Sequence, residues 1–84
     1  MIQRNIHVSF AGALLTRQAA DIAKQMNVFS SQVLLRSGNK TVNGKSLMGL
    51  LSLDLKDGQD VTMIVDGEDE ELAASTFERL ILGD

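Results

Sequence analysis

The sequence predicts an α+β fold in which a four-stranded antiparallel sheet keeps one face open and carries three helices on the other. Apolar residues alternate with polar ones in four short segments, which is the period of a half-buried strand. In three other segments they recur at three- and four-residue spacing, as in amphipathic helices. The segments follow the order β-α-β-β-α-β-α, and we expect residues 1–84 to form one domain.

The first predicted strand begins at Ile2, where Ile6, Val8 and Phe10 alternate with polar residues. His7 falls on the polar face, and we interpret it as a solvated strand residue. The small residues 11–13 then form a loop before the first helix.

That helix is predicted from Thr16 to Met26, with Thr16 or a neighbour as its N-cap. Arg17 lies at its start, where backbone N–H groups and a guanidinium suit an anion, although a solvated arginine is the commoner outcome. The predicted buried stripe comprises Ala19, Ile22, Ala23 and Met26.

A β-hairpin is predicted next. Two β-prone runs, Gln32–Arg36 and Lys40–Val42, are joined by the turn residues 37–39, Ser-Gly-Asn. Asn43 and Gly44 are interpreted as a strand-to-helix loop, because a helical run follows.

A short helix is predicted to start after Ser46, which precedes an apolar run and serves as the N-cap. Gly49 weakens its middle, and Asp57-Gly58 marks a turn soon after it.

The apolar residues of this helix point in two directions at 100° per residue. One group, Leu50 with Leu53, is expected in the core. The other is expected to stay at least partly exposed as a docking patch beside Ser46 and comprises Leu47, Met48 and Leu51. The alternative is a wholly buried apolar helix with an ordinary serine cap.

The last strand is predicted around Val61, Met63 and Val65, which share one face. A third helix follows, with Asp69 as its cap and acidic residues in its first turn. We therefore attribute the acidic run 66–71 to helix electrostatics and not to a cation site. The predicted buried stripe comprises Leu72, Ala73, Thr76, Phe77, Leu80 and Ile81.

Composition excludes several classes of function. The absence of cysteine rules out disulfides, thiolate catalysis and cysteine metal sites, and we expect no metal and no cofactor. Eight basic and eleven acidic residues without a basic block, and only three aromatic side chains, argue against direct nucleic-acid binding. No apolar run reaches the length of a signal peptide or membrane span, so we expect a soluble cytoplasmic protein.

The element order and three segments resemble a known family. The segments are residues 16–20 (Thr-Arg-Gln-Ala-Ala), residues 40–49 around Lys45-Ser46-Leu47-Met48-Gly49, and residues 67–70 (Gly-Glu-Asp-Glu). Over essentially its whole length the chain resembles the HPr family of histidine-containing phosphocarrier proteins.

In that family a phosphoryl group passes through a histidine at the start of the first helix. The corresponding position is Leu15, and Gln18 stands where the family has proline. A leucine has no lone pair to attack a phosphoryl donor, so we expect no relay chemistry and no enzyme activity here. Thr16 lacks an evident general base, and His7 lies on the open face of its strand.

The resemblance also implies a regulatory role through Ser46, the position modified by an HPr kinase/phosphorylase. The phosphoserine form then binds a LacI-type catabolite control repressor. The chain looks most like the branch without the histidine, the catabolite repression HPr-like proteins (Crh), although that branch is expected to have Gln at position 15. The expected partner surface comprises Leu15, Arg17, Lys45, Leu47, Met48 and Leu51.

The oligomeric state and two other functions stay open. Strand-swapped dimers occur in the Crh branch, and residues 12–13 could form the hinge, so we expect a monomer or such a dimer. The chain could instead be a phosphotransferase system (PTS) component using Thr16 or His7, or a degenerate member that binds PTS enzymes without turnover. In the third reading Ser46 is only a helix cap.

Overall fold

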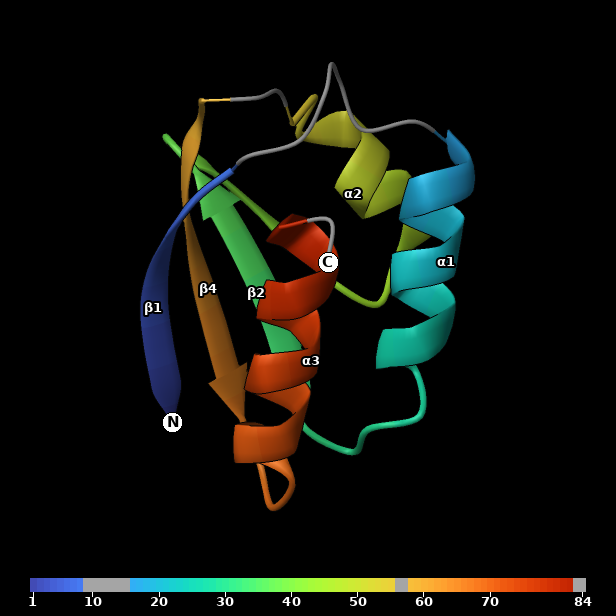
Figure 1. Ribbon diagram of the computed structural model, residues 1–84, viewed down its shortest axis with the longest axis vertical. Coiled ribbons are helices and arrows are strands. Elements are labelled where there is room, and N and C mark those ends of the chain that lie inside the picture. The colour runs from blue at the N-terminus through green and yellow to red at the C-terminus, as the bar shows by residue number, and fades with distance from the viewer. Residues whose placement is uncertain (9–15, 56–57, 83–84) are drawn as a thin grey trace.

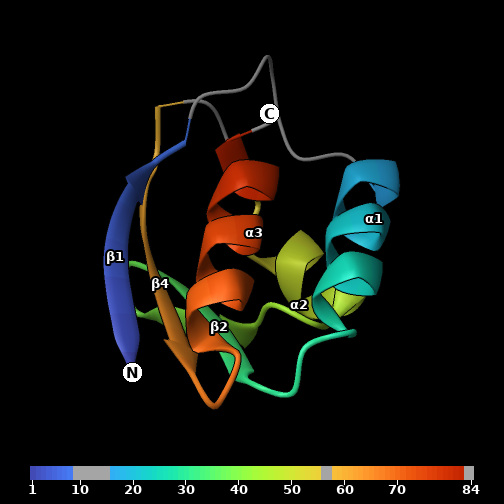
Figure 2. The same cartoon turned by 60° about the horizontal axis from the view of Figure 1, so that its bottom comes forward.

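A four-stranded antiparallel sheet lies on one side of the molecule and the helices lie on the other (Figures 1 and 2). The computed structural model describes residues 1–8, 16–55 and 58–82. Within these ranges the strands are β1 (Ile2–His7), β2 (Gln32–Ser37), β3 (Lys40–Asn43) and β4 (Asp60–Asp66), and the helices are α1 (Thr16–Met26), α2 (Leu47–Ser52) and α3 (Glu70–Leu82). The predicted element order and the open-faced α+β sandwich are confirmed.

The order of strands across the sheet is β1-β4-β2-β3. β4 is therefore an inner strand, with Ile2 opposite Val65 on one side and Val33 opposite Val65 on the other. β3 forms one edge through its hairpin with β2, and β1 forms the other. The turn of the hairpin is Gly38-Asn39, since β2 continues one residue further than predicted, and Gly38 has a φ of 60°.

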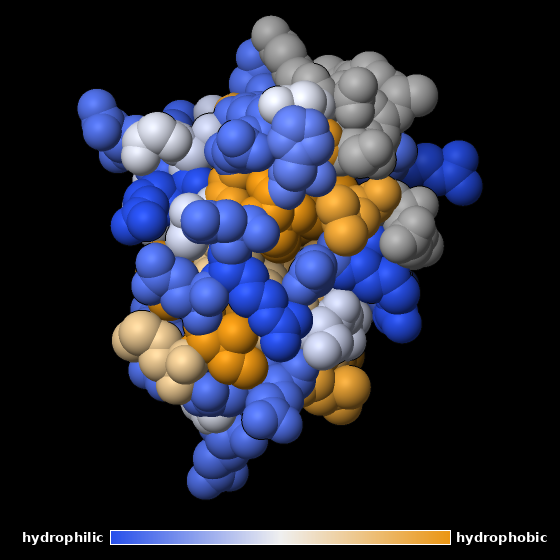
Figure 3. Space-filling model, turned by 60° about the vertical axis from the view of Figure 1, so that its left-hand side comes forward, coloured by the Kyte–Doolittle hydropathy of each residue, from blue (hydrophilic) through white to orange (hydrophobic). Residues whose placement is uncertain are grey.

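The predicted alternation holds along β1 and β4. Ile6, Val61 and Met63 are buried against the helices, whereas Asn5 and His7 are exposed on the outer face. Seen from the side of β1, the surface is mostly hydrophilic, with apolar side chains gathered in an interrupted band (Figure 3). The predicted strand residue Phe10 and the predicted loop 11–13 lie outside the described residues.

The buried stripe of α1 is the predicted one, namely Ala19, Ile22, Ala23 and Met26. In α3 the buried residues are Ala73, Ala74, Phe77 and Ile81. The prediction for Leu72 is wrong, because this side chain is 65% exposed. At 100° per residue Leu72 lies about 150° from the middle of the buried stripe, and the small Ala74 takes a place in the core instead. Thr76 and Leu80 are only half-buried.

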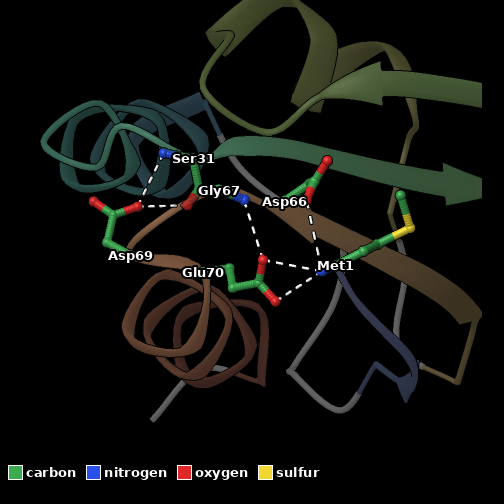
Figure 4. Close-up of polar contacts among 6 residues, drawn as sticks. All are labelled: Met1, Ser31, Asp66, Gly67, Asp69 and Glu70. Carbon is green, nitrogen blue, oxygen red and sulfur yellow. Dashed lines mark hydrogen bonds and ion pairs between the residues drawn. The ribbon is translucent and has the colours of Figure 1, made fainter.

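Asp69 lies directly before α3, as predicted, but its carboxylate stabilises another segment. It accepts a hydrogen bond from the backbone N–H of Ser30 at 2.9 Å. It also accepts hydrogen bonds from the backbone N–H of Ser31, at 2.9 Å, and from the Ser31 hydroxyl (Figure 4). The Ser31 hydroxyl and the Ser30 N–H lower the pKa of Asp69 from 3.8 to about 2. The connection between α1 and β2 is thus held to the start of α3.

Glu70 joins the start of α3 to β1. Its carboxylate contacts the N-terminal ammonium of Met1 at 2.9 Å and accepts a hydrogen bond from Gly67 N (Figure 4). The ammonium lowers the pKa of Glu70, with a smaller contribution from the Gly67 N–H, and the bond to Glu70 raises the pKa of the ammonium. The acidic run therefore makes specific contacts with other segments, beyond its effect on the helix start.

Candidate functional site

Ser46 is the N-cap of α2, as the sequence predicts. Its φ and ψ are −108° and 120°, and its Oγ accepts a hydrogen bond from Gly49 N at 3.1 Å. The backbone of Ser46 accepts from Leu50 N and donates to Asn43 O, both at 3.0 Å. The half-buried hydroxyl is therefore held in one orientation at the first turn of the helix.

The apolar residues of α2 divide into the two predicted groups. Leu50 and Leu53 are buried, whereas Met48 is 75% exposed and Leu47 and Leu51 are half-buried. The alternative of a wholly buried helix is wrong, because a helix of six residues shows only part of its surface to the core. An apolar side chain thus lies on the surface within two residues of Ser46.

Gly44 fixes the position of the connection between β3 and α2. A Cβ at this residue would lie 2.7 Å from Val33 Cγ1 and 2.9 Å from Phe77 Cζ, which are both in the core. Only a residue without a side chain allows this close approach. The Gly44 N–H also donates to Val33 O at 2.8 Å, so the loop that carries Ser46 packs directly on the sheet.

Lys45, the residue before Ser46, contacts the connection that follows α1. Its Nζ donates a hydrogen bond to Phe29 O at 2.6 Å, and its backbone O accepts one from Asn27 Nδ2 at 2.9 Å. Its backbone N–H donates to Asn43 Oδ1 at 2.9 Å. No local pattern predicts these contacts, because residues 27 and 29 meet residue 45 only in the folded chain.

Arg17 lies in the first turn of α1, and its side chain is exposed. It borders a shallow surface hollow with Gln18, Asp21 and Lys24. Among the described residues Arg17 makes no salt bridge. Because α1 packs beside α2 (Figure 1), Arg17 and the α2 residues belong to neighbouring helices. The predicted surface residue Leu15 lies outside the described residues.

His7 lies far from Ser46 in the topology of the sheet. It ends β1 at one edge, whereas Ser46 follows β3 at the other edge. Its Nδ1 is 2.8 Å from Asp60 Oδ1, and the side chain is 68% exposed. The pair orients the imidazole on the outer face of the sheet, separately from the surface around α2.

The described part of the chain shows neither a metal-binding cluster nor a membrane-spanning helix. Its His, Asp and Glu side chains form no group of three that could hold a metal ion. None of its helices has the length and apolar character needed to cross a bilayer.

Comparison with known proteins identifies the family. The model of the PTS HPr component phosphorylation site matches residues 2–82. The chain belongs to the HPr family. Among HPr-family proteins it is 42% identical over 73 residues to the HPr-like protein Crh of Bacillus subtilis, covering 87% of this chain and 86% of that protein.

Solved HPr-family structures have the same fold. The phosphocarrier protein HPr of Bacillus anthracis aligns with a TM-score of 0.89 and 31% identity over 95% of each chain. A crystal structure of Bacillus subtilis Crh, described as a dimer with a swapped domain, aligns with a TM-score of 0.77 and 38% identity, covering 96% of this chain and 93% of that one. The family assignment made from the sequence is confirmed, and the chain is an HPr-like protein related to the PTS.

Proposed function

We propose that this single-domain chain is a non-catalytic regulatory HPr-like protein, controlled by phosphorylation of Ser46 and acting through protein partners. The observation that carries the proposal is the position of the Ser46 hydroxyl at the start of α2, two residues before the exposed Met48. A phosphate group would add about two negative charges beside an apolar contact residue, which changes what the surface can bind.

The fold should tolerate this modification. A phosphate at Ser46 would lie at the positive end of α2, near first-turn N–H groups that favour negative charge. Modification therefore acts as a local electrostatic switch and leaves the core unchanged. Arg17 would offer a charged contact to the partner, while Leu15, Leu47, Met48 and Leu51 would offer apolar ones. Lys45 is the remaining member of this proposed surface.

The proposed modifying enzyme is an HPr kinase/phosphorylase, and the proposed partner is a LacI-type catabolite control repressor. Two features support this pairing: similarity to Crh and Leu15 at the carrier position. Because the proposed donor is ATP, we place the protein in the cytoplasm.

The test compares two phosphoryl donors. Purified protein is incubated with ATP and an HPr kinase/phosphorylase, and separately with phosphoenolpyruvate and the first enzyme of the PTS. The intact mass is then measured and any phosphate is mapped. We expect one acid-stable phosphate on Ser46 from ATP and none from phosphoenolpyruvate. Ser46→Ala should abolish the modification, whereas Ser52→Ala, at the other end of the same helix, should leave it intact.

The second candidate function is a PTS component that transfers phosphate, or that binds PTS enzymes without turnover. The match to the PTS HPr model and the oriented imidazole of His7 favour it. Acid-labile phosphate from phosphoenolpyruvate would support transfer and overturn the leading proposal. No phosphate from either donor would leave Ser46 as a helix cap alone.

The oligomeric state is a separate part of the proposal. Similarity to a protein described as a swapped-domain dimer supports a strand-swapped dimer as one form of this chain beside the monomer. Light scattering coupled to size-exclusion chromatography separates the two forms by mass.

A further inference from the structure

Two loops meet beside Ser46. One is the connection between β3 and α2, which contains Lys45, and the other is the connection between α1 and β2, here called the Phe29 loop (residues 27–31). Lys45 Nζ donates to Phe29 O at 2.6 Å. Asn27 Nδ2 donates both to Lys45 O at 2.9 Å and to Ala23 O at 2.7 Å. The side chain and the backbone of Lys45 therefore each contact the Phe29 loop.

The Phe29 loop is anchored at both ends. At its start, Asn27 N donates to Ala23 O at 3.1 Å, and at its end Asp69 accepts from the N–H groups of Ser30 and Ser31. Between these anchors, the Phe29 carbonyl is held by the ammonium of Lys45. The middle of the loop also exposes Val28, whose side chain is 78% accessible. A change at Lys45 therefore acts on the segment that presents this apolar side chain.

A phosphate on Ser46 would compete for the same ammonium. Lysine carries a compact charge on a flexible four-carbon chain, and Lys45 directly precedes Ser46. A dianionic phosphate attracts an ammonium more strongly than a neutral carbonyl oxygen does, because the hydrogen bond then joins two opposite charges and gains their Coulomb attraction. Asn27 stays bonded to backbone carbonyls on both sides and holds the start of the loop.

We propose that Lys45 couples the phosphorylation state of Ser46 to the Phe29 loop. Phosphorylation draws Lys45 Nζ from Phe29 O to the phosphate, the middle of the loop loosens, and Val28 becomes free to adapt to a partner. This inference rests on the proposed modification of Ser46. It extends the switch from the surface of α2 to the connection between α1 and β2.

The test installs phosphoserine at position 46 during translation, so that no kinase is needed. Hydrogen exchange of the amides of Phe29, Ser30 and Ser31 is compared between modified and unmodified protein. The amides of β4 serve as an internal reference for global stability. We expect exchange in the loop to become about tenfold faster on modification, the size expected for one lost hydrogen bond to a charged group.

Two lysine variants show whether Lys45 transmits the effect of phosphoserine to the Phe29 loop. In Lys45→Met the loop should exchange fast before modification, and phosphoserine should add nothing, because the competing ammonium is absent. Lys40→Met is the matched control: Lys40 Nζ donates to Ser52 O at 2.9 Å, at the other end of α2, and this variant should keep the full response.

Equal exchange in modified and unmodified protein would overturn the coupling, and so would a response that survives Lys45→Met. The proposed function is tested separately: it fails if Ser46 takes up no phosphate from ATP and an HPr kinase/phosphorylase. A loop response to installed phosphoserine supports the coupling whichever result the kinase gives.

Discussion

Replacing Ser46 by alanine should weaken α2 without unfolding the protein. The substitution removes one acceptor, the Oγ that lies 3.1 Å from Gly49 N, while the backbone bonds of Ser46 to Asn43 and Leu50 remain. Loss of a serine N-cap costs about 1 kcal/mol. For a domain of this size that corresponds to a decrease in Tm of about 4–8 °C. Because small domains are stable by about 5 kcal/mol or more, the variant stays folded.

Urea denaturation followed by circular dichroism measures this change. The matched control is Ser52→Ala: Ser52 Oγ donates to Gly49 O at 2.7 Å at the exposed end of α2, and we expect a change within about 0.5 kcal/mol. Ser46→Asp keeps an acceptor at the cap and should recover most of the loss. An unchanged midpoint in Ser46→Ala would refute the capping role. A loss above about 3 kcal/mol would show that the hydroxyl supports more of the fold than one helix turn.

Three further predictions concern packing and pH. Gly44→Ala should lower the free energy of unfolding by about 1–3 kcal/mol, because its Cβ would lie 2.9 Å from the buried Phe77 Cζ. An unchanged midpoint of urea denaturation would contradict this tight contact. The pKa of Asp69 is lowered from 3.8 to about 2, so its contribution to stability is present above about pH 4 and is lost as the pH falls toward 2. In Asp69→Asn, thermal unfolding measured over a pH series should show a smaller loss of stability between about pH 4 and 2. An equal loss in this variant would mean that other carboxylates cause the acid destabilisation. Leu72→Gln should change the free energy of unfolding by less than about 0.5 kcal/mol, whereas Phe77→Ala should lower it by about 3–5 kcal/mol. Equal decreases in the Tm of the two variants would contradict the exposure of Leu72 and the burial of Phe77.

Local patterns predicted the elements and the cap because each depends on residues close in sequence. The stripe of α1 was predicted correctly because both large apolar residues of the helix, Ile22 and Met26, belong to it, and the one apolar residue outside it, Ala20, is small. In α3, Leu72 belongs to a broader set of apolar residues, and the axial rotation of the helix decides which of them is buried. That rotation is set by packing on the sheet, where Ala74 fits closely.

Sequence patterns predicted the positions of Ser46 and Met48 in the candidate site, but not the contacts of Lys45. Ser46 and Met48 follow from one helix and its cap. The contacts of Lys45 with the Phe29 loop join residues 16 positions apart and are satisfied by backbone carbonyls, which carry no sequence signal. Similarly, nothing in the local pattern indicated that the carboxylate of Asp69 would bind a loop 38 positions earlier. Tertiary hydrogen bonds to the main chain are the part that pattern reasoning misses.

The place of β4 in the sheet has a consequence for synthesis. Among the described residues β4 is the last strand in sequence order, yet both β1 and β2 pair with it. The β1–β4 pairing joins residues at least 53 positions apart, the smallest separation being that of His7 and Asp60, so closing it carries a large entropic cost. A nascent chain that ends before Asp60 can form the β2–β3 hairpin, but β1 still lacks β4, the strand with which its backbone pairs. The sheet should therefore assemble in one late step after β4 has left the ribosome, and until then the chain should be a substrate for chaperones.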